Sequence, residues 1–315
     1  MGEIPIPTPS DSQVLVKTKC FALNRMDIVQ RQGNYPPPPG GSEILGVEIS
    51  GIVESVGKNV TKFKPGDAVF GLMPGGAYAE YAVIEEGLTM LKPDALSFEQ
   101  AAAIPETWFT AYQALFFVAE LKAGQDILIH AGASGVGIAA IQLAKDHGAR
   151  RIFVTAGSDE KCKFCESLGA TRAINYKTDD WAKVIAEETS QKGVDIIIDV
   201  IGKNYWHQNI SILGVDGRMV ILAFMSGYEI EKVDLRLFLK KRLRVEASSL
   251  RSRTIEYQAR LRDALYEDVI LNHIAKEDGT LKLFIDKVFD WKDIAKSHEY
   301  LESNQSMGKI VVTIS

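Results

Sequence analysis

The spacing of apolar and polar positions changes along the chain and predicts two kinds of domain. Residues 14–94 contain short apolar runs of strand type, separated by glycines and prolines. This pattern is typical of an all-β, barrel-like domain with irregular loops. From about residue 97 the spacing becomes helical: Ser97 and Gln100 form a capping-box pattern, and residues 107–121 carry apolar positions at helical intervals.

Strand-like and helix-like segments then alternate, which predicts a parallel sheet with helices on both faces. The expected strands are 127–130, 151–155, 173–176, 194–200 and 218–222, and the expected helices are 136–147, 159–168, 179–190 and 204–213. After a strand-like run at 244–249, helices are expected around 254–271 and at 292–303. A last strand, 309–314, is expected to return to the first domain.

A glycine-rich turn joins strand 127–130 to the helix that follows it. Such a turn presents backbone N–H groups and a helix N-terminus to a dinucleotide pyrophosphate. Ser134 replaces the usual second glycine of the motif. The residues expected to contact a cofactor here are Gly132, Ser134, Gly135, Val136 and Gly137. The alternative is that these glycines serve only the packing of the helix on the strand.

The tip of strand 151–155 carries no carboxylate, which favours NADP(H) over NAD(H) because an acidic residue there usually binds the ribose hydroxyls. Gly157 leaves room for a 2′-phosphate, Ser158 can donate a hydrogen bond, and Lys161 adds a cation near a helix N-terminus. Tyr176 could stack on or bond the adenosine phosphate. The alternatives are a solvated Lys161 beside an adverse or helix-capping Asp159, and a partly buried core tyrosine at position 176.

Composition excludes several classes of partner. The net charge is −5, from 36 basic and 41 acidic residues, and gives no reason to expect binding to nucleic acid or to an anionic membrane. No apolar run reaches transmembrane length, so the cytoplasm is the expected compartment. Cys162 and Cys165 form a C-x-x-C within helix 159–168, where a redox or metal role competes with that of ordinary helix residues.

Taken together and in this order, the motifs resemble those of the medium-chain dehydrogenase/reductase superfamily, specifically its zinc-independent, zeta-crystallin-like quinone oxidoreductases. The segments that carry the likeness are 22–35, 44–51, 64–69, 132–137, 156–158 and 308–311. The stretch 199–252 looks closest to the stress-inducible quinone reductase branch. The resemblance implies an α/β protein with a GroES-like catalytic domain (1–107 and 253–315), a Rossmann cofactor domain (108–252), NADP(H) as cofactor and a homodimer.

The likeness also bears on metal binding and on the N-terminus. Zinc-dependent members of the superfamily use an early cysteine, a histidine in a Gly-His-Glu element and a four-cysteine lobe. This chain has Val47 in place of that histidine and only three cysteines, so too few ligands remain for zinc and a metal-free mechanism is expected.

Family members carry a β-hairpin before the motif at 7–14, and a missing strand there is expected to expose a sheet edge.

The resemblance further implies roles for individual residues. Asn24, Asp27 and Tyr35 would line the cleft beside the nicotinamide, and Thr110 would lie near its carboxamide. The positions that match the adenosine-phosphate site are Gly157, Ser158, Lys161 and Tyr176. The residues that would border the nicotinamide ring are Phe224, Met225, Ser226, Ser249 and Leu250. Asn304 would approach the cofactor from the C-terminal segment. Helix capping by Asn24 and Asp27, and a core helix role for Thr110, are the alternatives.

The expected reaction is metal-free hydride transfer from NADPH to a quinone, with Tyr35 or Asn24 donating a hydrogen bond to the acceptor oxygen. No general acid is singled out, and His130 is expected to orient backbone rather than to shuttle protons. One alternative is a reductase of enones, 2-alkenals or enoyl thioesters. The other is a non-catalytic, crystallin-like protein that binds NADPH.

Overall fold

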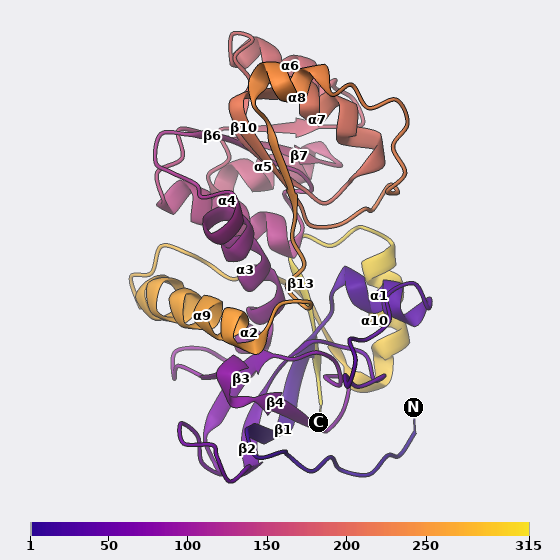
Figure 1. The fold of residues 1–315 in the computed structure, drawn as a ribbon. Coiled ribbons are helices and arrows are strands. Elements are labelled where there is room, and N and C mark those ends of the chain that lie inside the picture. The colour runs from indigo at the N-terminus through magenta and orange to yellow at the C-terminus, as the bar shows by residue number, and fades with distance from the viewer. Residues whose placement is uncertain (1, 315) are drawn as a thin grey trace. The chain divides into compact units, whose positions relative to one another are not determined.

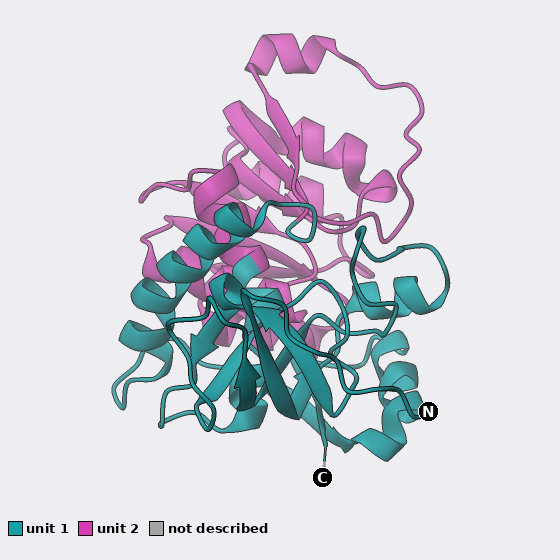
Figure 2. Cartoon of the chain, turned by 60° about the horizontal axis from the view of Figure 1, so that its bottom comes forward, with its two compact units in different colours: residues 1–109, 250–315 teal, residues 110–249 magenta. Residues whose placement is uncertain are grey.

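The computed structural model describes residues 2–314, which divide into two compact units (Figures 1 and 2). Unit 1 comprises the chain up to Phe109 and again from Leu250, and unit 2 is Thr110–Ser249. The boundaries expected from the sequence, after residues 107 and 252, lie within three residues of these limits. No helix in the described range is long and apolar enough to cross a membrane.

Unit 1 is built on a sheet in which the two ends of the chain meet. Its strands are β1 (Gln13–Ala22), β2 (Glu48–Val56), β3 (Ala68–Leu72), β4 (Tyr81–Glu85), β5 (Thr89–Leu91), β12 (Ile285–Asp290) and β13 (Lys309–Thr313). Its helices are α1 (Arg25–Arg31), α2 (Phe98–Ala102), α9 (Ile255–Leu265) and α10 (Ile294–Glu302), while α3 (Pro105–Tyr112) runs on into unit 2. The strand order is β12-β13-β1-β2-β3-β5, with β4 also on β1.

Strand β1 is paired along both of its sides. One side pairs with β2, and the other pairs with β4 over residues 13–17 and then with β13 over residues 20–22. The expected return of the last strand to the first domain is therefore confirmed. The expected exposed edge is not found at β1 within the described residues.

Alternate residues of these strands point into one core, as the two-residue period of a strand requires. The buried members include Val14 and Val16 of β1, Ile49 and Val53 of β2, and Ile310 and Val312 of β13. Residues from both ends of the chain thus share one hydrophobic interior. Burial of this apolar surface is the main force that holds unit 1 together.

Unit 2 is a doubly wound parallel sheet. Its strands are β6 (Asp126–Ile129), β7 (Arg151–Ala156), β8 (Arg172–Asn175), β9 (Val194–Asp199), β10 (Leu213–Ile221) and β11 (Arg244–Ala247). Its helices are α4 (Gly135–Asp146), α5 (Asp159–Leu168), α6 (Trp181–Glu188), α7 (Trp206–Ile212) and α8 (Arg236–Lys241). The order is β11-β10-β9-β6-β7-β8 and every pairing is parallel, which confirms the predicted Rossmann-type sheet.

Several element boundaries differ from those expected. The expected helix 204–213 ends at residue 212, because Leu213 already pairs with Val194 at the start of β10. The helices expected at 107–121 and 254–271 each end in a π-helical segment, at 113–118 and 266–274. The capping box at Ser97 and Gln100 is confirmed.

Candidate functional site

The glycine turn between β6 and α4 has the geometry of an anion site. Ser134 is the N-cap of α4, and its hydroxyl accepts the Gly137 N–H at 3.1 Å. The N–H groups of Gly135 and Val136, in the first turn of the helix, have no acceptor within it. Both residues are only half-buried. Backbone donors at a helix N-terminus are what a pyrophosphate requires, so these residues fit a dinucleotide.

Packing alone also demands glycine at two positions of this turn. A Cβ atom at position 132 would lie 2.0 Å from Val154 Cγ1, and one at position 137 would lie 2.5 Å from the Ala131 carbonyl oxygen. Ala131 itself takes a left-handed conformation with φ of 54°. The glycines therefore serve the close approach of α4 to the sheet as well as the exposure of its first N–H groups.

The residues expected to bind the adenosine phosphate gather beyond β7. A Cβ at Gly157 would lie 2.8 Å from the Tyr176 hydroxyl, so the tyrosine closes over this glycine. Ser158 caps α5 by accepting the Lys161 N–H at 3.2 Å. Because β6, β7 and β8 are parallel neighbours, the turns that follow them share one edge of the sheet.

Two of the alternatives at this edge are wrong. Asp159 does not cap α5, and its carboxylate instead accepts a hydrogen bond from the Asn175 side chain at 2.7 Å. Tyr176 is not a core residue, because 43% of it is exposed.

The loops after β9 and β10 are tied to each other at the same edge of the sheet. The fully buried Asp199 accepts the Ile201 N–H at 2.7 Å, and burial raises its pKa to about 6. The Ser226 hydroxyl donates to the Ile201 carbonyl at 2.8 Å. Phe224 and Met225 beside it are exposed, and Ser249 follows β11. Asp199 was not expected as a site residue, although it lies in the stretch that carries the family likeness.

His130 stands at the end of β6 but does not orient backbone as expected. Its Nδ1 lies 2.9 Å from the Thr155 hydroxyl and its Nε2 lies 2.8 Å from Asn209 Oδ1. The ring contacts those of Trp181 and Tyr205. Burial lowers the pKa of His130 to about 4, so the ring is neutral at physiological pH.

The C-x-x-C pair has the properties of ordinary helix residues. Cys162 and Cys165 are buried in α5. Burial raises the pKa of the Cys165 thiol to about 12 and also raises that of Cys162, which disfavours the reactive thiolate. Among residues 2–314 no group of three or more His, Cys, Asp or Glu side chains could hold a metal ion.

In unit 1, Asn24 and Asp27 cap α1 and are buried. The Asp27 carboxylate accepts the Asn24 N–H at 2.8 Å, which agrees with the capping alternative. The Asn24 side chain donates to Glu48 Oε1 at 2.7 Å and accepts from Lys309 Nζ at 2.8 Å. This amide is therefore engaged inside the protein.

A buried ion pair that sequence reasoning missed lies next to Asn24. Lys309 Nζ donates to Glu48 Oε1 at 2.6 Å, to Asn24 Oδ1 at 2.8 Å and to the Leu23 carbonyl at 2.9 Å. The other Glu48 oxygen accepts the Glu106 N–H at 2.7 Å. Glu48 and Lys309 fall within segments that carry the family likeness, but 261 positions separate them in the chain.

The remaining residues expected beside the nicotinamide differ in their exposure. The Arg251 guanidinium lies 5.3 Å from the centre of the half-buried Tyr35 ring. The exposed Asn304 accepts a hydrogen bond from Arg25 Nη2 at 2.6 Å through Oδ1. Leu250 is buried where the chain returns to unit 1. Thr110, in α3, is half-buried.

Comparison with known proteins decides the family. The family model described as alcohol dehydrogenase GroES-like domain matches residues 10–94, and the one described as zinc-binding dehydrogenase matches residues 135–265. The quinone oxidoreductase of Sus scrofa is 32% identical over 315 residues, which cover 99% of this chain and 92% of that protein. That of Pseudomonas aeruginosa is 33% identical over 310 residues, covering 96% and 92%.

The chain belongs to the quinone oxidoreductase family of the medium-chain dehydrogenase/reductase superfamily. Solved structures of this family share the fold. The Escherichia coli quinone oxidoreductase complexed with NADPH is 31% identical, with a TM-score of 0.87, and covers 99% of this chain and 94% of that one. The GroES-like and Rossmann-type architecture expected from the sequence is confirmed.

Proposed function

We propose that this protein is an NADPH-dependent quinone oxidoreductase. The observation that carries the proposal is the edge of the unit 2 sheet, where the N–H groups of Gly135 and Val136, which have no acceptor within their helix, adjoin a β7 tip without a carboxylate. Gly157, Ser158, Lys161 and Tyr176 supply space, hydroxyls and a cation for a 2′-phosphate there. The similarity to quinone oxidoreductases, one of them solved with NADPH, supports the same assignment.

The chain's own contribution is to bind and orient. Gly135 and Val136 would bind the pyrophosphate, and the residues expected at the nicotinamide end are Thr110, Phe224, Met225, Ser226, Ser249, Leu250 and Asn304. NADPH supplies the hydride when bound, and the protein supplies alignment. We assign the hydrogen bond to the acceptor oxygen to Tyr35 rather than Asn24. The Tyr35 hydroxyl has no hydrogen-bond partner among the described residues, whereas the Asn24 amide donates to Glu48.

The direct test is to mix the purified protein with NADPH and a panel of ortho- and para-quinones, and to follow the loss of nicotinamide absorbance, with NADH as control. NADPH-selective oxidation is expected, and it should persist after treatment with a chelator. Activity that is lost to the chelator and restored by zinc would contradict the metal-free mechanism.

Lys161→Ala should weaken NADPH binding far more than NADH binding, because only NADPH carries the phosphate that the ammonium would contact. We expect the ratio of the two affinities to change by about 10-fold or more, as for a lost charge-assisted hydrogen bond. Calorimetric titration with both cofactors measures it. Lys163→Ala is the matched control, since Lys163 is an exposed lysine of the same helix. An unchanged ratio in Lys161→Ala would refute the 2′-phosphate assignment.

A second candidate is reduction of an activated carbon–carbon double bond. The enoyl reductases CurK and JamJ are 27% and 26% identical to this chain, with TM-scores of 0.86 and 0.87. Adding a 2-alkenal, an enone and an enoyl thioester to the panel separates the two activities. Tight NADPH binding without turnover of any acceptor would instead favour the non-catalytic, crystallin-like role.

We also propose that the protein is a homodimer. Strand β11 is the last strand of the unit 2 sheet among the described residues, and an open sheet edge is a template for pairing with a second copy. Light scattering coupled to size-exclusion chromatography gives the mass directly. A monomer at micromolar concentration would refute this proposal and leave the catalytic one untouched.

A further inference from the structure

We propose that Glu106 is the proton donor to the reduced acceptor. The inference rests on the proposed function, since it assigns the proton that hydride transfer to a quinone requires. Sequence reasoning singled out no general acid, and the residues expected beside the nicotinamide include none that holds a transferable proton near neutral pH except the buried Asp27. Glu106 lies in α3, the helix that also carries Thr110.

The burial pattern of α3 brings Glu106 and Thr110 together. Every residue of this helix is buried except these two, which are half-buried. Because they are four positions apart, they lie on the same face, one turn from each other. Thr110 is the residue proposed to lie near the nicotinamide carboxamide. The one accessible strip of α3 therefore consists of that threonine and a carboxyl group.

The charges around Glu106 leave its carboxyl uncompensated. The titratable groups that face it are Glu48 from β2, Lys309 from β13, Asp27 from α1 and Arg251. Lys309 uses all three of its N–H donors on Glu48, Asn24 and Leu23. The Arg251 guanidinium donates to the Pro74 carbonyl and to Gln30.

The Glu106 carboxyl has no hydrogen-bond partner among residues 2–314, whereas its backbone N–H is held by Glu48. Burial, followed by the adjacent Glu48 carboxylate, raises the pKa of Glu106 to about 8. Glu106 thus keeps its proton at neutral pH although it is accessible. A general acid works best when its pKa is near the working pH.

The atoms and electrons of quinone reduction balance when Glu106 is the proton donor. A quinone gains one hydride and one proton when it becomes a hydroquinone. NADPH supplies the hydride, with its electron pair, and leaves as NADP⁺. The Glu106 O–H bond breaks, its proton passes to the quinone oxygen that has gained negative charge, and the carboxylate that is left takes a proton from solvent before the next turnover.

Glu106→Gln tests this assignment, because the amide matches the carboxyl in shape but has no acidic proton. In the wild type, kcat should fall as the pH rises through about 8, since only protonated Glu106 can donate. In Glu106→Gln, kcat should be about 100-fold lower and should lack this alkaline decline. The wild type and Glu106→Gln should bind NADPH with the same affinity. Glu99→Gln, which alters another half-buried glutamate of unit 1, is the matched control and should behave as the wild type.

A second readout needs neither cofactor nor turnover. Infrared difference spectra of the cofactor-free protein should show a protonated carboxyl that titrates near pH 8 and is absent from Glu106→Gln. A wild type without that signal, or a Glu106→Gln variant with wild-type kcat and pH profile, overturns the assignment alone. No turnover of any quinone by the wild type overturns the proposed function and the assignment together.

Discussion

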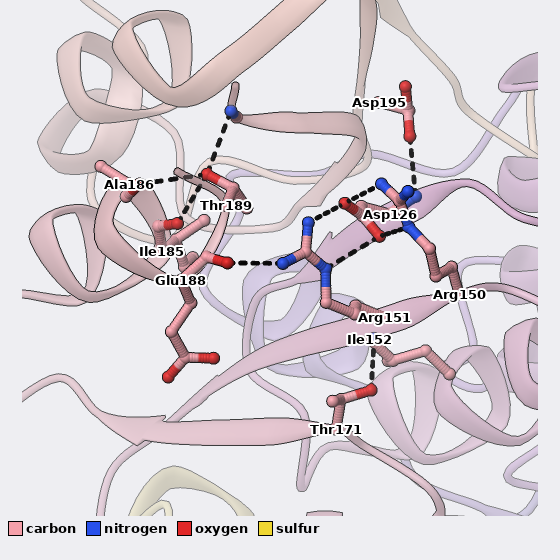
Figure 3. Close-up of polar contacts among 11 residues, drawn as sticks. Asp126, Arg150, Arg151, Ile152, Thr171, Ile185, Ala186, Glu188, Thr189 and Asp195 are labelled. Atoms are coloured by element: carbon pink, nitrogen blue, oxygen red, sulfur yellow. Dashed lines mark hydrogen bonds and ion pairs between the residues drawn. The ribbon is translucent and has the colours of Figure 1, made fainter. Parts of the chain in front are cut away.

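Two buried carboxylates, Asp126 in unit 2 and Glu48 in unit 1, differ in the number of cations that donate hydrogen bonds to them. Asp126 is 1% exposed and lies between the side chains of Arg150 and Arg151 (Figure 3). Glu48 is fully buried and has one cation, Lys309, while two further carboxyls, Asp27 and Glu106, lie nearby. The Asp126 carboxylate thus has two cationic partners, whereas the Glu48 carboxylate has one and lies near two further acids.

The hydrogen bonds from two arginines make Asp126 an anchor, that is, an ionised group that ties elements of unit 2 together. Arg150 donates to both Asp126 oxygens, at 2.9 and 2.6 Å, and Arg151 also donates to both. Arg151 further donates to the Glu188 carbonyl at the end of α6. Burial favours the neutral acid, but the hydrogen bonds from the two arginines outweigh it and lower the pKa of Asp126. Asp126 therefore stays ionised and fastens β6, β7 and α6 together.

The two acids near Glu48 hold their protons more tightly than free carboxyl groups do. Burial raises the pKa of Asp27 to about 6 and that of Glu106 to about 8. For a carboxyl with a raised folded pKa, the free energy of unfolding falls as the pH rises from the unfolded pKa to the folded one. For Asp126, with a lowered pKa, stability is instead lost as the pH falls below about 4. The comparison teaches that a buried acid of this chain stays ionised where cations donate hydrogen bonds to it, and that burial raises its pKa where none does.

Removing the cation that pairs with Glu48 should have the largest effect. Lys309→Met leaves Glu48 as an uncompensated buried charge, and we expect the free energy of unfolding to fall by about 3–5 kcal/mol. Denaturant unfolding monitored by circular dichroism measures this change.

The double variant Glu48→Gln with Lys309→Met controls for the loss of the lysine itself. It removes the buried charge together with its partner, so it should recover part of the lost stability. A loss below about 1 kcal/mol in the single variant would show that the pair is not buried as described.

Removing the charge of Asp126 should reduce stability less than removing Lys309, because the two arginines that Asp126 binds can be solvated once they lose it. Arg150 and Arg151 have 61% and 27% of their side chains exposed. Asp126→Asn should cost about 2 kcal/mol at pH 7. The difference from wild type should shrink as the pH falls below about 4, because Asp126 of the unfolded chain takes up a proton there before the paired carboxylate of the folded protein does.

Asp216→Asn is the control for the anchor, because Asp216 pairs with Arg242 on the surface, where both side chains are mostly exposed. It should change stability by less than about 1 kcal/mol. Equal losses in Asp126→Asn and Asp216→Asn would contradict the distinction between an anchor and a surface pair.

Sequence patterns predicted those features of unit 2 that depend on residues close to one another in the chain. The glycine turn, the alternating strands and helices of unit 2 and the tip of β7 all involve residues that are near each other in the chain. Such features follow from hydrophobic periodicity and turn chemistry. The seven-residue α1 was missed because it is too short for a helical period to show, although capping by Asn24 and Asp27 was considered.

The acidic cluster could not be predicted in this way. Glu48 and Lys309 meet only because β13 returns to β1 from the far end of the chain, 261 positions away. Glu106 looks like an ordinary glutamate in the first turn of a helix, where acidic residues are common. Its significance depends on which donors Lys309 has already used, and only the assembled sheet of unit 1 shows that.

Substitution of Tyr78 should change stability least of the variants proposed for the acidic cluster. Its hydroxyl belongs to a chain of hydrogen bonds that ends at Asp27. Its hydroxyl lies 3.1 Å from Asp27 Oδ2 and 3.1 Å from His298 Nε2. His298 Nδ1 lies 3.1 Å from Arg31 Nη1. Because a guanidinium only donates, Nδ1 accepts, Nε2 carries the hydrogen, and the Tyr78 hydroxyl donates to Asp27.

Tyr78→Phe removes the last donor of this chain. The unfolding free energy should fall by about 1 kcal/mol, and the pKa of Asp27 should rise further above 6, since the lost hydrogen bond stabilised its charged form. Carboxyl carbon NMR titration follows Asp27 directly, and the exposed Asp11 serves as an internal reference. An Asp27 pKa that stays the same or falls would mean that the Tyr78 hydroxyl does not donate to this carboxylate, which would leave the Asn24 N–H as its hydrogen-bond donor.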